Sequence, residues 1–492
     1  MRGPERVKDD LDRSGELREL WEQDERQAVA ERNGWHRDDP GPQNPSDDRF
    51  AGEQHTGQVR IAYRLRAAYR DRLLHVHGLG WHYWDGTRWA ADDSGTAKRA
   101  VLDVLRCSLA DSLGDKRLQQ DVRRCESDSG INGVLGIAAA LVPFAAAARN
   151  LDADPYLLNT ANGTLDLRTL IMSAHRPADR ITKICNGAYH PDAGSPLWIA
   201  FLARVLPDQS VREFLQRLVG VALLGAVREH VLPILTGVGA NGKGTFYEAV
   251  LHTLGDYAST AEPDLFMHRD GAHPTGEMDL MGRRLIVVSE SERNRRLAEA
   301  TMKRLTGGDP IRARRMRQDF VQFDPSHLPM LITNHLPKVS ADDAAVWRRL
   351  RVVPFDVVIP EDEREGALGE RLKLEADGIL GWALAGWRDY SDRGALDEPS
   401  RVLAATDAYQ VASDALRRFI DEECVVSTPA LKATTSQLFQ AFEKWRVRDG
   451  AEALSQKVFG QALDRQGYPA SNPVRGKRWR TGIALRATDE EE

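Results

Sequence analysis

The sequence predicts an α/β protein, and three features in the middle of the chain predict it. The segment VLPILTGVG, at 231–239, has the composition of a short apolar strand that runs directly into a glycine-rich loop. The segment 244–255, which follows the loop, has the character of a helix. Two further apolar segments, 285–288 and 328–334, each end in polar residues. Strands that alternate with helices in this way are typical of the α/β class.

The composition limits the class of protein. The chain has 492 residues, 42% hydrophobic and 28% charged, and this length corresponds to roughly three domains. The net charge of −6 shows no global attraction to nucleic acid, although arginine is clustered locally. No apolar run approaches the ~18 residues that span a bilayer. The four cysteines are scattered, which argues against a zinc knuckle or a disulfide framework. We therefore expect a soluble cytoplasmic protein with reduced thiols and no membrane partner.

The N-terminal part divides into a tail and a domain. Residues 1–57 are rich in charged and polar residues and carry too few aliphatics for a core, so we expect a disordered charged tail. Residues 58–205 predict an α+β domain, with a helix and two strand pairs around turns at 85–86 and 162–163. Its aromatic residues fit a core better than a base-stacking platform.

The glycine-rich loop nearly matches a phosphate-binding loop. The pattern G-x-x-x-x-G-K-[ST] holds triphosphates through backbone N–H groups and the lysine, and the chain offers GVGANGKGT. The hydroxyl expected at position 244 is missing, because that residue is glycine. Nucleotide binding tolerates this loss, whereas Mg²⁺ would depend on Thr245 or on a retained water. The expected nucleotide-binding residues are Gly237, Gly239, Asn241, Gly242, Lys243, Gly244 and Thr245.

Polar residues downstream complete a candidate ATPase. Glu290 follows the strand 285–288, where a carboxylate can hold the magnesium-bound water and polarise the attacking water. Asn334 ends the next strand and can orient that water. Arg348 or Arg349 would neutralise the charge that develops in phosphoryl transfer, when supplied by a neighbouring subunit. In isolation, a solvated glutamate and a surface basic helix would be the simpler interpretations. The pattern predicts ATP and Mg²⁺ as ligands, with Glu290 and Thr245 near the metal.

These segments together resemble a known family, the superfamily 3 helicase domain of phage and plasmid primase–helicases, the group that includes the poxvirus replication helicase. The resemblance is carried by GVGANGKGTF, RLIVVSESE, KRLTGGDPIRARRMRQDF, LITNH and DDAAVWRRLRVVPF. It extends upstream through WDGTRW and LLNTANGTLDLRT and covers about 60–485. It implies an AAA+-type P-loop ATPase core at 206–400 that works as a ring, expected to be a homohexamer. A cytoplasmic location in a bacterial host cell is also implied.

The resemblance also implies a path for single-stranded DNA. The segment KRLTGGDPIRARRMR matches the region whose hairpin lines the pore of the ring and follows the strand. Its arginines alternate as a strand or hairpin that grips a phosphate backbone would require. The expected contacts are Arg312, Arg314, Arg315 and Arg317.

The C-terminal segment predicts a second interface, with duplex DNA. Residues 401–486 contain three amphipathic helices followed by a strand pair with a basic turn, which is typical of a winged-helix domain. The expected DNA contacts are Lys457, Lys477, Arg478 and Arg480. A protein-docking domain is the alternative for this segment. The last residues, 487–492, are acidic and expected to be disordered.

We therefore expect an ATP-dependent DNA helicase of phage or mobile-element replication. The region before the helicase core is too short for a polymerase-type primase domain, so we expect a separate primase as a partner. A DNA-binding initiator or loader with a decayed ATPase is the first alternative, and Gly244 favours it. A P-loop kinase acting on a small molecule is the second, and Asn334 and the arginine pair argue against it.

Overall fold

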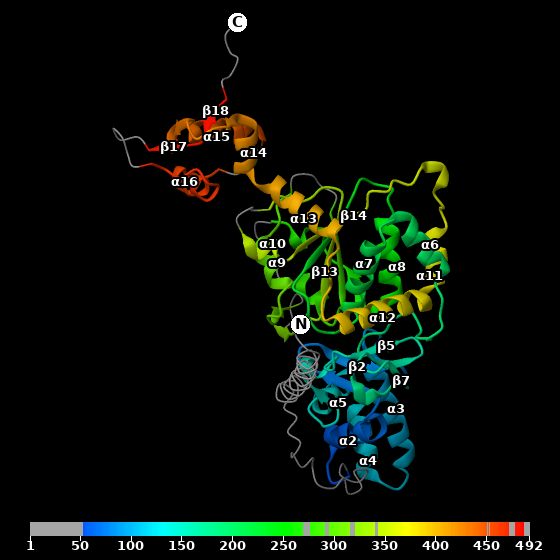
Figure 1. Cartoon of the computed structure of the whole chain (residues 1–492). Coiled ribbons are helices and arrows are strands. Elements are labelled where there is room, and N and C mark those ends of the chain that lie inside the picture. The colour runs from blue at the N-terminus through cyan, green and yellow to red at the C-terminus, as the bar shows by residue number, and fades with distance from the viewer. Residues whose placement is uncertain are drawn as a thin grey trace, which may run out of the picture. The chain divides into compact units, whose positions relative to one another are not determined.

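The computed structural model describes residues 53–268, 276–290, 295–314, 320–339, 343–449, 451, 453–471 and 478–486 (Figure 1). The chain forms two compact units. The first contains the residues up to Ile184 and the hairpin Ile311–Phe323, and the second contains Cys185–Pro310 and Asp324–Glu492. Most of the predicted tail and all of 487–492 lie outside the described residues. Within the described ranges, no helix has the length and apolar character that crossing a membrane requires.

The first unit begins with a four-helix core against a small sheet. Leu65, Val101, Val122 and Val134, one from each helix, are buried together in that core. The sheet has the order β3-β2-β1-β4, and the turn at 85–86 joins β2 and β3 as predicted. The elements are α2 (Gly57–Tyr69), β1 (Leu73–Val76), β2 (Gly80–Trp84), β3 (Trp89–Ala91), α3 (Thr96–Asp111), α4 (Lys116–Cys125), α5 (Asp128–Ala138) and β4 (Ala145–Ala146).

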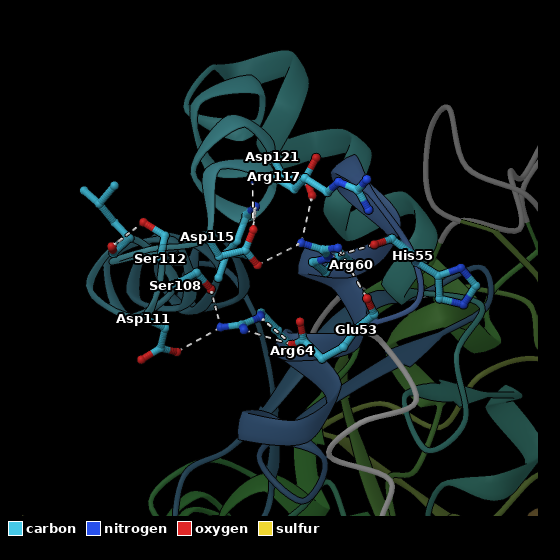
Figure 2. Close-up of polar contacts among 12 residues, drawn as sticks. Glu53, His55, Arg60, Arg64, Ser108, Asp111, Ser112, Asp115, Arg117 and Asp121 are labelled. Atoms are coloured by element: carbon cyan, nitrogen blue, oxygen red, sulfur yellow. Dashed lines mark hydrogen bonds and ion pairs between the residues drawn. The ribbon is translucent and has the colours of Figure 1, made fainter.

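A buried arginine fixes the start of the described chain to this core. Figure 2 shows the Arg60 guanidinium between the segment that enters α2 and the carboxylates of Asp115 and Asp121. Its Nε donates to the His55 carbonyl oxygen at 2.7 Å. Asp115 also accepts from two backbone N–H groups at the start of α4, so one carboxylate caps a helix and contacts the arginine. Residues 53–57, predicted to belong to the tail, therefore have fixed partners.

The second strand group of the first unit is a three-stranded antiparallel sheet. It comprises β5 (Leu157–Thr160), β6 (Gly163–Asp166) and β7 (Ile171–Ser173), with the predicted turn at 162–163. Asn159 is fully buried, and its amide donates to the carbonyl oxygens of Thr87 and Lys183, both at 3.0 Å. Trp89 is buried, which fits the core interpretation of the aromatic residues.

The second unit contains a five-stranded parallel sheet with the order β14-β8-β13-β10-β9. The predicted α/β class is confirmed by this sheet and its helices. β13 follows β10 in the chain but is inserted between β8 and β10 in the sheet. The strands are β8 (Leu232–Thr236), β9 (Ala258–Thr260), β10 (Leu285–Glu290), β13 (Leu328–Thr333) and β14 (Leu350–Pro354).

Helices pack around this sheet and define the boundaries of the unit. α7 lies along α12, and α12 also contacts α8 (Figure 1). Trp198 of α6 stacks on Phe246 of α8 at 5.5 Å, so α6 belongs with the sheet although it precedes the predicted boundary at 206. The helices are α6 (Pro196–Val205), α7 (Gln209–Val221), α8 (Lys243–Leu254), α9 (Glu299–Leu305), α10 (Ala344–Trp347), α11 (Leu368–Lys373), α12 (Ala376–Arg393) and α13 (Ser400–Ser413).

The C-terminal module starts later than the predicted residue 401. The Thr406 hydroxyl of α13 accepts the backbone N–H of Val352 in β14 at 2.9 Å, which ties α13 to the parallel sheet. The module itself has three helices and short antiparallel strands around Phe419, Phe442 and Phe459. Its elements are α14 (Ala415–Glu423), β15 (Cys424–Val425), β16 (Lys432–Thr434), α15 (Thr435–Asp449), α16 (Gln456–Arg465), β17 (Trp479–Thr481) and β18 (Ala484–Leu485).

Candidate functional site

The glycine-rich loop leaves β8 and closes at the start of α8, and two of its glycines are sterically required. Gly237 has a φ of +148°, and a side chain there would clash with the Phe355 carbonyl oxygen. Gly242 has a φ of +84°, and a Cβ would lie 2.6 Å from the Cγ1 of Val205. Both positions need glycine for its backbone freedom and its small size. These two glycines therefore let the loop pass close to Phe355 and Val205 before the first turn of α8.

Lys243 is the centre of the site. Its side chain is buried, and Nζ donates to the Gly237 carbonyl oxygen at 2.7 Å, Asn241 Oδ1 at 3.1 Å and Asn334 Oδ1 at 3.2 Å. An ammonium group has three donors, and these three acceptors use all of them. Burial lowers the pKa of Lys243, because the charged form loses solvation. All three acceptors are neutral.

A buried cation without a charged partner is costly, so this arrangement points to an anionic ligand. The ion pairs found among the described residues do not include Lys243. The site also lies at the N-terminal end of α8, a helix of 12 residues, where unpaired N–H groups and the helix dipole favour negative charge. A phosphate group would satisfy both features.

The register of the sheet aligns the carboxyl ends of three strands. Thr333 of β13 pairs with Thr236 of β8 on one side and with Glu290 of β10 on the other. Asn334, which directly follows Thr333, therefore lies between the loop and the acidic strand. Its Oδ1 accepts a hydrogen bond from Lys243 Nζ at 3.2 Å. Glu290 is placed by its backbone, and its side chain lies outside the description.

The residues near the helix start leave room for a metal bound mainly through the nucleotide. A Cβ built on Gly244 meets no atom within 4 Å, so the space of the missing hydroxyl is open. Among the described residues, no group of three or more His, Cys, Asp and Glu could hold a metal by itself. Mg²⁺ in nucleotide sites keeps several waters and uses one or two protein oxygens with the phosphates. Of the two residues predicted to lie near a metal, Thr245 directly follows the open position at Gly244.

The two predicted arginines lie at the opposite end of the strands, before the amino end of β14. Leu350 pairs with Leu232, and four residues at ~3.3 Å each separate that pair from the carboxyl end of β8, where the loop begins. Arg348 is exposed and caps the C-terminus of α10, and no polar partner of its side chain is found in the described ranges. Arg349 is partly buried, and its Nη1 donates to the Ala345 carbonyl oxygen at 2.8 Å. Neither side chain can serve its own loop.

A charged pair that sequence reasoning missed holds the short helix before these arginines. Asp343 caps α10 by accepting the N–H groups of Ala345 and Val346, and it also accepts Lys303 Nζ of α9 at 2.7 Å. The hydrogen bond from Lys303, with the two backbone N–H groups, lowers the pKa of Asp343. Asp-Asp before an apolar turn is a capping signal, which could have identified Asp343 in the sequence.

The predicted DNA-binding hairpin is present as β11 (Ile311–Ala313) and β12 (Val321–Phe323), and it belongs to the first unit. A Cβ on Gly78 would lie 3.1 Å from Val321, so the hairpin packs closely on the small sheet. Arg312 and Arg314 are exposed on its outer face. The other two expected contacts, Arg315 and Arg317, lie outside the described residues.

In the C-terminal module, the expected DNA contacts have different environments. Lys457, at the start of α16, and Arg478, before β17, are exposed. Lys477 lies outside the described residues. The prediction for Arg480 is contradicted, because its side chain is 97% buried: it forms an ion pair with Asp464 and donates to the Gly460 carbonyl oxygen at 2.8 Å. It stabilises the module instead of facing a ligand.

Two protein families match parts of the chain. Residues 62–207 match the family described as "D5 N terminal like", and residues 235–349 match one described as "Family of unknown function (DUF5906)". The second match runs from β8 to the end of α10 and includes the loop, Glu290, Asn334 and Arg348. The chain thus carries a D5 N terminal like region.

Curated relatives are proteins of large DNA viruses. "Putative helicase L207/L206" of Acanthamoeba polyphaga mimivirus is 28% identical over 349 residues, 66% of this chain and 36% of that protein. "Putative helicase 022R" of Frog virus 3 is 25% identical over 285 residues, 54% of this chain and 29% of that protein. "Putative primase C962R" of African swine fever virus is 24% identical over 384 residues, which are 71% of this chain and 40% of that protein. The matches thus span about a third of these relatives' length.

Among solved structures, the chain is similar to the apo C-terminal region of NrS-1, with a TM-score of 0.40 and 12% identity over 65% of this chain and 90% of that chain. The names helicase and primase belong to the viral relatives described above.

The two environments in the C-terminal module make a testable contrast. Arg480→Ala should destabilise the module by about 2 kcal/mol, since buried carbonyl oxygens lose their donor and Asp464 loses its partner. Arg478→Ala, an exposed neighbour, should leave thermal unfolding unchanged. Calorimetry on both variants checks this, and equal melting temperatures would contradict the structural role of Arg480.

Proposed function

We propose that the protein is an ATP-dependent DNA helicase of viral or mobile-element replication, which works as a ring and moves along single-stranded DNA. The observation that carries the proposal is Lys243, a buried ammonium group that faces neutral acceptors at the start of a helix. The homologues named helicases and primases support the same class of function. ATP is the substrate that this site and the resemblance together favour.

The residues around Lys243 have separable tasks in this proposal. Lys243 would exchange its bonds to Gly237 and Asn241 for phosphate oxygens, which removes the penalty of its buried charge. Asn334 contacts Lys243 and would orient the attacking water beside the terminal phosphate. Glu290, one strand further, would accept a proton from that water. Bound Mg²⁺ would neutralise charge on the phosphates, and Glu290 together with a retained water near Gly244 would hold it.

Arg348 would act on the nucleotide of a neighbouring subunit. The parallel register puts it at the amino end of the strands, whereas its own loop lies at their carboxyl end. An exposed guanidinium at the end of a short, capped helix is placed to reach another copy, whereas Arg349 is held by the Ala345 carbonyl oxygen. Of the two predicted arginines, we therefore assign the trans role to Arg348. A ring in which each site is completed by its neighbour follows from this assignment.

Mixing two inactive variants tests the trans assignment. Random assembly of Arg348→Ala with Lys243→Ala subunits in equal amounts leaves about a quarter of interfaces with both groups intact. ATP hydrolysis with single-stranded DNA should therefore recover to about that fraction of the wild-type rate. Mixing Lys243→Ala with the Lys243→Ala/Arg348→Ala double variant is the matched control, because no interface has an intact loop. Equal rates in both mixtures would refute the trans role.

The glycine at position 244 sets up a second test. Consecutive side chains on a helix diverge by ~100°, so Thr245 cannot take the place of a hydroxyl at 244. We expect a slow ATPase in which a water fills that place. Gly244→Ser fits the open space and should raise turnover or magnesium affinity, while Thr245→Ala should have little effect. If Thr245→Ala abolishes hydrolysis and Gly244→Ser impairs it, Thr245 is the metal ligand instead.

The same glycine favours the initiator or loader as a second candidate. A loop without the hydroxyl can still bind ATP, so a nucleotide-stabilised DNA-binding scaffold would keep Lys243 and lose turnover. Hydrolysis assays with the wild-type protein across magnesium concentrations, with single-stranded DNA, separate the two. Binding of ATP without any hydrolysis would replace the helicase by the scaffold.

A further inference from the structure

The outer face of the hairpin carries an aromatic side chain beside the two predicted arginines. The antiparallel register pairs Ala313 with Val321, so Arg314 and Phe320 occupy the next opposed positions. Arg312 lies two residues from Arg314 and therefore on the same face. Phe320 is 46% exposed. Together they form a cluster of two cations and one ring, which we call the hairpin cluster.

The inner face of the same hairpin has the opposite character. Ile311, Ala313, Val321 and Phe323 are buried, whereas Arg312, Arg314, Phe320 and Gln322 are exposed. The inner residues anchor the hairpin on its own unit, and strand alternation then forces the outer ones into solvent. Strand alternation therefore accounts for the exposure of Phe320. A polar residue at this position would be equally compatible with the packing of the inner face.

Both guanidinium groups contact the ring. The Cζ atoms of Arg312 and Arg314 lie 4.8 Å and 4.6 Å from the centroid of Phe320. Cation–π contacts of this kind hold the ring and the two charges in one arrangement. Proteins that bind single-stranded nucleic acid combine the same two elements, cationic groups for the backbone and aromatic or guanidinium planes on which bases stack.

We propose that the hairpin cluster binds an unpaired nucleobase of single-stranded DNA, with Phe320 as the stacking residue and Arg312 and Arg314 on the neighbouring phosphates. The proposal rests on the proposed function, because it specifies what the hairpin recognises in its DNA. It adds a contact to the base, where a backbone-gripping hairpin needs phosphate contacts alone. Stacking tolerates every base, so binding through Phe320 requires no particular sequence.

A purely structural role for Phe320 makes a different prediction. If the ring only holds the two arginines in place, its loss weakens phosphate contacts and lowers the affinity equally for any strand with the same charge. If the ring stacks on a base, its loss lowers the affinity only for strands that have bases. Oligodeoxythymidine and an abasic oligonucleotide of the same length carry the same number of phosphates and differ in this respect.

The experiment measures the affinity of the full-length protein for both oligonucleotides by fluorescence anisotropy. Phe320→Leu should weaken binding to oligodeoxythymidine on the order of tenfold per contacted base, and binding to the abasic strand much less. Phe320→Trp should retain or strengthen the wild-type preference for the strand with bases. Equal losses on both strands, or no loss on either, would overturn the proposal.

Salt dependence separates the ring from the charges. Phe320→Leu should leave the slope of log affinity against log salt unchanged, whereas Arg314→Ala should flatten it by about one unit. A flattened slope in Phe320→Leu would assign the ring a bracing role and reject stacking. A wild-type protein that hydrolyses ATP and binds both strands equally rejects the stacking residue alone, whereas one that binds neither strand rejects the proposed function as well.

Discussion

The candidate site depends on the alignment of three strand ends in the parallel sheet. β13 is inserted between β8 and β10, and Thr333 pairs with Thr236 on one side and Glu290 on the other. A slip of one residue in this pairing would move Asn334 out of line with the loop that follows Thr236. The contact between Asn334 and Lys243 exists because this register is fixed by buried strands. Segments some 90 residues apart in the chain meet there.

The charge of Lys243 is the second constraint. Its three acceptors are neutral, and burial lowers its pKa, so the site holds a cation that solvent and the described acids do not compensate. A site of this kind gains most from an anion with several oxygens. The glycines of the loop serve that purpose, since they bring backbone close to the lysine and leave the first turn of α8 uncovered. Position 244 offers no hydroxyl, whereas the hydrogen bonds of Lys243 involve Gly237, Asn241 and Asn334.

Different predicted site residues lie at the two ends of the parallel strands. The loop, Asn334 and Glu290 lie at the carboxyl ends of the strands, and Arg348 lies beyond the amino end of β14. Asp343 accepts a hydrogen bond from Lys303 on α9, and this contact holds the short helix that precedes Arg348.

Local pattern determined much of this protein from its sequence. The loop, its flanking strand and helix, and the turns at 85–86 and 162–163 follow from residue types a few positions apart, and the structure has them where the sequence predicts them. Contacts between distant segments could not be predicted in this way. Burial of Arg480 against Asp464 and the grouping of the hairpin with the first unit depend on which faces pack together. The different environments of Arg348 and Arg349 could not be predicted either, because arginines one residue apart have the same local pattern. The structure leaves the Arg348 side chain exposed and partly buries Arg349, whose Nη1 donates to the Ala345 carbonyl oxygen.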